Sequence, residues 1–169
     1  MTATSKMGSA SPARNWLRWA GIVLAILGLA IAAYMSYAEL SGQETSCPGA
    51  TDEAGAAGAV AVDCGFVQHS IYATVLGIPV AIIGVAGFLA ILGAWLLEDR
   101  IGFLREFGHV LVFGMALFGF LFEAYLTYAE LFIMYTVCTW CLLTALAITL
   151  VFVVATIRLI QHFRQPITD

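Results

Sequence analysis

The sequence is poor in charged residues, which make up 11% of its 169 positions. Soluble domains carry roughly 25%, so an ordinary soluble protein is excluded. The net charge is -4 and the sequence has no cluster of basic residues, which argues against a nucleic-acid partner. The apolar stretches are continuous and do not alternate with polar residues, so a β-barrel is disfavoured. The hydrophobic share of 62% therefore predicts an all-α integral membrane protein.

Four apolar runs are long enough to cross a membrane, which takes about 20 residues. They predict spanning helices over residues 16–40, 71–97, 107–135 and 138–160. The first run also resembles a secretory signal, but it is too long for one. We expect a four-transmembrane-helix bundle over residues 16–161, with an outer, cysteine-bearing loop at 41–70. Pro79 is expected to kink the second helix.

The basic residues indicate how the bundle is oriented. With four spans, all seven Lys and Arg residues fall on the side shared by the two termini. The positive-inside rule then makes residues 1–15, expected to be disordered, and 162–169 cytoplasmic tails. All four cysteines come to lie on the outer, extracytoplasmic face, where disulfides persist. Four cysteines are too few for a disulfide scaffold, so their positions matter more than their number.

Cys138 and Cys141 form a CxxC sequence at the start of the last expected helix. The unsatisfied N–H groups of a helix N-terminus favour the thiolate of Cys138, and Cys141 lies one turn deeper. Such a pair can exchange with an incoming thiol at its outer sulfur and serve a membrane-soluble acceptor at its inner one. The alternative is a pair of buried cysteines that act as small apolar residues.

Cys47 and Cys64 form a second pair in the outer loop. They either form a structural disulfide or act as a mobile redox pair that shuttles electrons to the CxxC. Residues 48–63 are rich in Gly and Ala, which favours mobility. A faint repeat relates residues 34–40 to 125–131, and the same offset carries Cys47 onto Cys138. A duplication and chance similarity between two helix ends explain it equally well.

This combination of cysteines resembles the vitamin K epoxide reductase family, and more narrowly its bacterial members. The shared features are two loop cysteines after the first span and a CxxC that opens the last span. The segment from Cys64 to Pro79, with its serine at position 70, is similar to the family's segment after the second loop cysteine. The resemblance covers residues 16–160 and implies a bundle that holds a quinone near the outer membrane surface.

The resemblance also implies a relay that ends in new disulfides in exported proteins. A separate DsbA-like, thioredoxin-like protein would meet Cys64, and Cys47 would attack the disulfide at Cys138. Cys141 would face a quinone of the ubiquinone or menaquinone type. Ser70 would help to position the quinone, although it equally suits the N-cap of the second helix. The expected function is that of a quinone-dependent, disulfide-generating oxidoreductase in the bacterial cytoplasmic membrane.

Other residues and functions carry weaker signals. Glu123 and His69 suit proton uptake, but we favour a polar contact in the bundle for Glu123 and a solvated surface position for His69. The DsbB-like quinone reductases carry their CxxC in the first outer loop, unlike this chain. A structural four-span protein with a loop disulfide and no redox turnover is the main alternative. A zinc site of four cysteines and a transporter fit the pattern less well.

Overall fold

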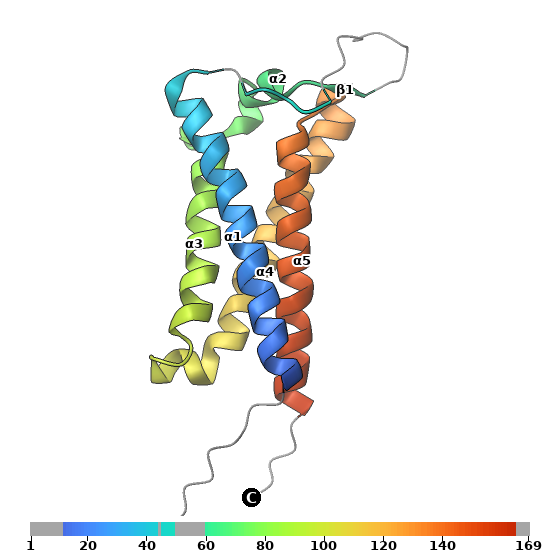
Figure 1. The fold of residues 1–169 in the computed structure, drawn as a ribbon. Coiled ribbons are helices and arrows are strands. Elements are labelled where there is room, and N and C mark those ends of the chain that lie inside the picture. The colour runs from blue at the N-terminus through green and yellow to red at the C-terminus, as the bar shows by residue number, and fades with distance from the viewer. Residues whose placement is uncertain (1–11, 44, 50–59, 165–169) are drawn as a thin grey trace, which may run out of the picture.

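The structure is a computed structural model that describes residues 12–43, 45–49 and 60–164. It is a bundle of four long helices (Figure 1). These are α1 (Pro12–Ser41), α3 (Val80–Leu97), α4 (Gly102–Ala129) and α5 (Thr139–Arg164). Each contains a stretch long and apolar enough to cross a membrane, with a mean hydropathy of at least 1.9. The prediction of an all-α integral membrane protein with four spans is confirmed.

Close contacts between small and aromatic side chains hold the bundle together. Helices α1 and α4 each pack against both α3 and α5, and neighbouring helices run antiparallel (Figure 1). A Cβ atom at Gly21 would clash with the ring of Trp95, and one at Gly28 would clash with Phe88. Lipid provides no hydrophobic drive for helices to associate, so this close packing is a main source of stability.

Short elements cover the end of the bundle at which α1 ends and α5 begins (Figure 1). They are β1 (Ala61–Val62), α2 (Cys64–Gln68), the 3₁₀ turn η1 (Ile71–Ala73), β2 (Thr74–Val75), β3 (Ile78–Pro79), the π-helical turn η2 (Glu130–Met134) and β4 (Thr136–Val137). Strand β1 pairs in parallel with β4, and β2 pairs with β3 in an antiparallel hairpin. This end carries all four cysteines.

The second helix begins at Val80, so the expectation of a helix over 71–97 kinked at Pro79 is wrong. Residues 71–79 form η1 and the β2–β3 hairpin instead. The two residues at the hairpin turn, Leu76 and Gly77, have φ values of 53° and 79°. Positive φ at both positions is what a two-residue hairpin turn requires. Pro79 lacks an N–H group and occupies the helix N-cap, so it starts the helix rather than bends it.

Helices α1 and α5 are longer than expected, and α4 both begins and ends earlier than expected. Helix α1 begins at Pro12, consistent with the preference for proline in the first helical turn. Helix α5 continues to Arg164, and α4 begins at Gly102 rather than at residue 107. Part of each expected tail is therefore helical. The remaining tail residues, 1–11 and 165–169, lie outside the described residues.

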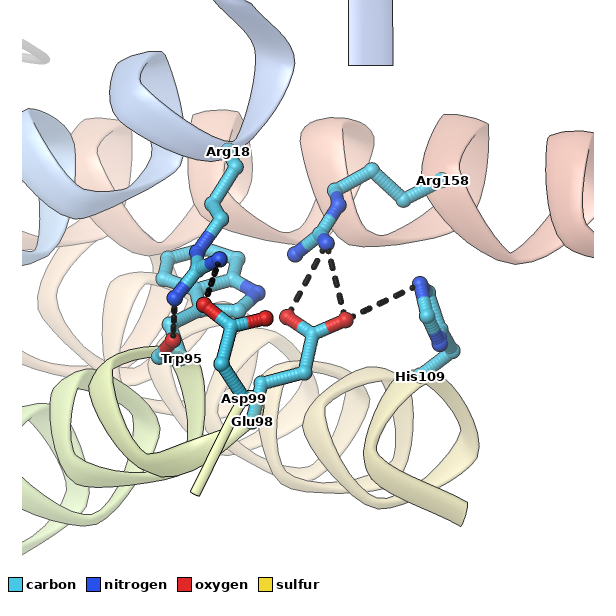
Figure 2. Close-up of polar contacts among 6 residues, drawn as sticks. All are labelled: Arg18, Trp95, Glu98, Asp99, His109 and Arg158. Carbon is cyan, nitrogen blue, oxygen red and sulfur yellow. Dashed lines mark hydrogen bonds and ion pairs between the residues drawn. The ribbon is translucent and has the colours of Figure 1, made fainter. Parts of the chain in front are cut away.

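A network of charged side chains ties the helices together at the end opposite the cysteines (Figure 2). Nη2 of Arg158 on α5 donates to both carboxylate oxygens of Glu98, at 3.1 and 3.0 Å. Nε2 of His109 on α4 lies 3.3 Å from Glu98 Oε1. Arg18 on α1 donates to Asp99 at 2.6 Å. Glu98 and Asp99 directly follow α3, so the network joins all four helices.

We expect Arg158→Met to lower the free energy of unfolding by about 3–5 kcal/mol, because it leaves the Glu98 carboxylate buried without its main partner. Arg158 and Glu98 are only 6% and 9% exposed. Denaturant-induced unfolding of the purified protein in detergent measures the change. Asp99→Asn is the matched control: that side chain is 70% exposed, so the loss should be within about 1 kcal/mol. Adding Glu98→Met to Arg158→Met should restore most of the stability. A loss no larger than that of Asp99→Asn would contradict this account.

Candidate active site

All four cysteines meet at one end of the bundle. Cys47 and Cys64 form a disulfide with Cα atoms 5.6 Å apart, whereas Cys138 and Cys141 are free thiols. Cys64 and Cys138 belong to one buried apolar cluster, and Cys47 and Cys141 pack against it. The loop disulfide therefore lies directly beside the CxxC.

Backbone pairing brings Cys64 to Cys138. Strand β1 lies beside β4, and the N–H of Asp63 donates to the carbonyl of Val137 at 3.2 Å. The next residues along the two segments are Cys64 and Cys138. Asp63 also caps α2, since its carboxylate accepts the N–H of residue 66 at 3.0 Å. The parallel pairing thus places a loop cysteine next to the first cysteine of the CxxC.

Two side chains inside the CxxC bind the part of the loop around Cys47. The hydroxyl of Thr139 donates to the carbonyl of Pro48 at 2.9 Å, and the indole N–H of Trp140 donates to the carbonyl of Ser46 at 3.0 Å. The Sγ atom of Cys47 lies 3.8 Å from Oγ1 of Thr139. Both segments that carry the loop cysteines are therefore bound to the start of α5.

The four cysteine side chains differ in their access to solvent. Cys64 is 1% exposed and Cys138 is fully buried, whereas Cys47 and Cys141 are each half-buried. A thiol that approaches from outside therefore reaches the sulfur of Cys47 more readily than that of Cys64. This order of accessibility is the reverse of the one that the family resemblance implies.

Cys138 directly precedes the first residue of α5, as the sequence predicted. A hydrogen bond from the Cys141 thiol lowers the pKa of the Cys138 thiol below its usual value, against the opposing effect of burial. The backbone N–H groups of Cys141 and Trp140 add to this lowering. The helix N-terminus thus contributes as expected, but the neighbouring thiol contributes more. Cys138 is the cysteine of the pair that is better suited to exist as a thiolate.

A cleft of about 740 Å³, counting its open mouth, lies beside the CxxC. Its lining comes from the cysteine ends of α1, α3, α4 and α5, from η2, and from α2 with the segment that follows it. The lining residues are Ala32, Met35, Glu39, Val67, Gln68, Ser70, Tyr72, Ala73, Val80, Ala81, Gly84, Phe88, Glu123, Leu126, Glu130, Met134, Trp140, Cys141 and Thr144. The walls are mostly apolar, with a few hydroxyl, carboxyl and thiol groups. This combination fits an apolar ring compound that carries oxygen atoms, such as a quinone.

Cys141 and Ser70 both line this cleft, and Cys138 does not. Ser70 lies ten residues before α3, so the expectation that it caps the second helix is wrong. Its hydroxyl donates to the carbonyl of Val67 at 2.7 Å. His69 is exposed and is not among the lining residues. Across the described residues, no three His, Cys, Asp or Glu side chains are arranged to hold a metal ion.

Sequence reasoning missed the residues that bind the loop to α5. Thr139 and Trp140 appeared only as the spacer of the CxxC, although a hydroxyl and an indole N–H there are potential donors. It also assigned no role to Glu130, whose carboxylate accepts the N–H of Cys138 at 3.3 Å. The faint repeat was a usable signal, because its two glutamates, Glu39 and Glu130, both line the cleft.

Comparison with known families agrees with this geometry. Residues 19–156, which are most of the chain, match the vitamin K epoxide reductase family. The match includes all four cysteines and the four spanning stretches almost completely.

We expect Trp140→Phe to speed reduction of the Cys47–Cys64 disulfide about fivefold. The change removes the bond to Ser46, worth about 1 kcal/mol, while a phenyl ring can still pack against Tyr34, 5.1 Å away between ring centroids. The measurement is the rate at which a water-soluble phosphine reduces the disulfide, followed by mass spectrometry. Trp19→Phe, at an exposed position on α1, is the control and should react like the wild type. Equal rates for all three proteins would show that the indole bond does not restrain the loop.

Proposed function

The chain belongs to the vitamin K epoxide reductase family, and on that premise we propose how this membrane thiol–disulfide oxidoreductase works. We propose that it reoxidises a DsbA-like, thioredoxin-like protein and passes the electrons to a quinone. One observation carries the proposal: a disulfide and a dithiol lie side by side, and the dithiol borders an apolar cleft. A disulfide that only stabilises a loop needs neither an adjacent dithiol nor an apolar cleft beside it.

The first half of the relay concerns the loop disulfide. A thiolate of the partner attacks the half-buried sulfur of Cys47, and Cys64 leaves as a thiolate. The second thiol of the partner then displaces Cys47, so the partner gains a disulfide and both loop cysteines are reduced. The burial of Cys64 favours this order over attack at Cys64, because exchange requires access to the attacked sulfur.

The second half concerns the CxxC. The Cys64 thiolate attacks Cys138 of an oxidised Cys138–Cys141 pair, and Cys141 is released. Cys47 then displaces Cys138 from Cys64, which restores the loop disulfide and leaves both CxxC thiols reduced. The described state, with a loop disulfide and a reduced CxxC, corresponds to the stage after this transfer.

The remaining step takes place at the cleft. A bound quinone supplies an acceptor for two electrons and two protons. Cys141 borders the site and serves as the sulfur next to that acceptor, while Cys138 closes the disulfide with it. Ser70 is suited to turn its hydroxyl from the Val67 carbonyl toward an oxygen atom in the cleft.

We also propose that the cysteine end faces outward from a bacterial cytoplasmic membrane. Arg18 and Arg158 lie at the opposite end of the bundle, and α5 ends there at Arg164 (Figures 1 and 2). The positive-inside rule places such an end in the cytoplasm. Partner exchange would then occur in an oxidising compartment, where new disulfides are stable.

The test of this function is anaerobic quinone reduction by the purified protein, with either dithiothreitol or a reduced thioredoxin-like partner as the electron source. We expect the wild type to use both sources and Cys141→Ser to lose at least a hundredfold in rate with both, since no CxxC disulfide can form. Thr156→Ser, on the same helix and away from the cleft, serves as the control. A wild-type protein that reduces no member of a ubiquinone and menaquinone panel would contradict the proposal.

The site of partner attack is testable with a thioredoxin-like protein that retains only its attacking cysteine. This partner should form a stable mixed disulfide predominantly at Cys47, because Cys64 is buried. Mass spectrometry of the linked peptides identifies the loop cysteine. A link predominantly at Cys64 would restore the order that the family resemblance implies. The absence of any mixed disulfide would favour a purely structural loop disulfide.

A further inference from the structure

Glu130 is a buried carboxyl group that has no role in the electron relay proposed above. It is 3% exposed and is the first residue of η2, the π-helical turn that follows α4. Single π-helical turns within helices are frequent at functional sites. Its Oε2 atom accepts the backbone N–H of Cys138 at 3.3 Å. The Cys141 thiol has one proton, which it can donate either to this carboxyl group or to the sulfur of Cys138. Glu130 thus contacts both halves of the CxxC.

Among the described residues that line the cleft with Glu130, there is no cation to pair with it. Three carboxyl groups line the cleft, those of Glu39, Glu123 and Glu130, and no Lys, Arg or His is among the described lining residues. Glu123 interacts instead with the hydroxyl of Thr144. Ionisable groups inside a membrane protein are costly and commonly functional. Glu130 differs from the other two carboxyl groups because it contacts a reacting thiol and borders the cleft at once.

We propose that Glu130 is the proton-transfer residue of the CxxC: it accepts the proton of the Cys141 thiol and passes it to the electron acceptor in the cleft. This inference rests on the proposed function. As the proton leaves, the sulfurs of Cys138 and Cys141 join in a disulfide and two electrons pass to the acceptor, a quinone. One proton reaches the acceptor through Glu130. The second comes from solvent and replaces the proton that Cys138 released when it became a thiolate, so Glu130 ends unchanged.

The test compares Glu130→Gln with the wild type in two independent measurements. The amide oxygen of Gln can still accept the Cys138 N–H, but an amide cannot carry the proton. The first measurement is the alkylation rate of Cys141 by iodoacetamide, without quinone, in a Cys138→Ala background that keeps the loop disulfide. The second is quinone reduction with dithiothreitol in the protein that retains all four cysteines. Glu106→Gln, at an exposed position at the other end of the same span, is the matched control.

We expect the two rates to move in opposite directions. Alkylation of Cys141 should become several-fold faster, because its thiolate no longer faces a carboxylate charge. Quinone reduction should fall at least a hundredfold, the usual contribution of a positioned proton-transfer group. Glu130→Asp should recover part of the quinone reduction, and Glu106→Gln should change neither rate.

Three results would overturn the inference. Unchanged quinone reduction would show that Glu130 transfers no proton. A fall in both rates would show that Glu130 only maintains the structure around the CxxC. Unchanged alkylation with slower quinone reduction would show that Glu130 acts away from Cys141. If the wild type reduces no quinone, the proposed function fails instead, and the alkylation rates still report whether Glu130 faces the thiol.

Discussion

Hydrogen bonds between the outer loop and the start of α5 are the constraint on which the site depends. The pairing of β1 with β4 fixes one flank of the loop, and the side chains of Thr139 and Trp140 fix the other. Each bond contributes only about 1 kcal/mol. Together they hold the Cys47–Cys64 disulfide against the apolar cluster that contains Cys138. The same docking buries Cys64, leaves Cys47 accessible and closes one side of the cleft. Without this docking, nothing would hold the loop disulfide next to the CxxC.

The sequence predicted the bundle well because one physical property decides it. Apolar runs of about 20 residues have few alternatives to a spanning helix. The prediction failed where this property is uninformative, at residues 71–79. This segment continues an apolar run, and only Gly77 and Pro79 indicate that it turns back as a hairpin before α3 begins. The two-residue strands β1 and β4 are also too short to show a recognisable period.

The sequence indicated which cysteines make up the candidate site but not how they are arranged. The spacing of Cys138 and Cys141, and the second pair in the loop, identified four sulfurs from sequence alone. Which loop cysteine remains accessible depends on how the loop docks, because docking places Cys64 in a buried cluster with Met35 and Val67. Glu130 is the first residue of a π-helical turn and its carboxylate accepts the N–H of Cys138. Neither feature follows from hydropathy or motif spacing.

The position of every cysteine and of the cleft at one end of the bundle has a consequence for energetics. By the proposed route, electrons enter and leave on the same side, and the protons are exchanged there as well. Neither electrons nor protons cross the long apolar part of the bundle between the cleft and the Glu98–Arg158 ion pair at the opposite end. Turnover then moves no net charge through the low-dielectric layer. The membrane potential, which acts on charges that cross this layer, neither drives nor opposes the reaction.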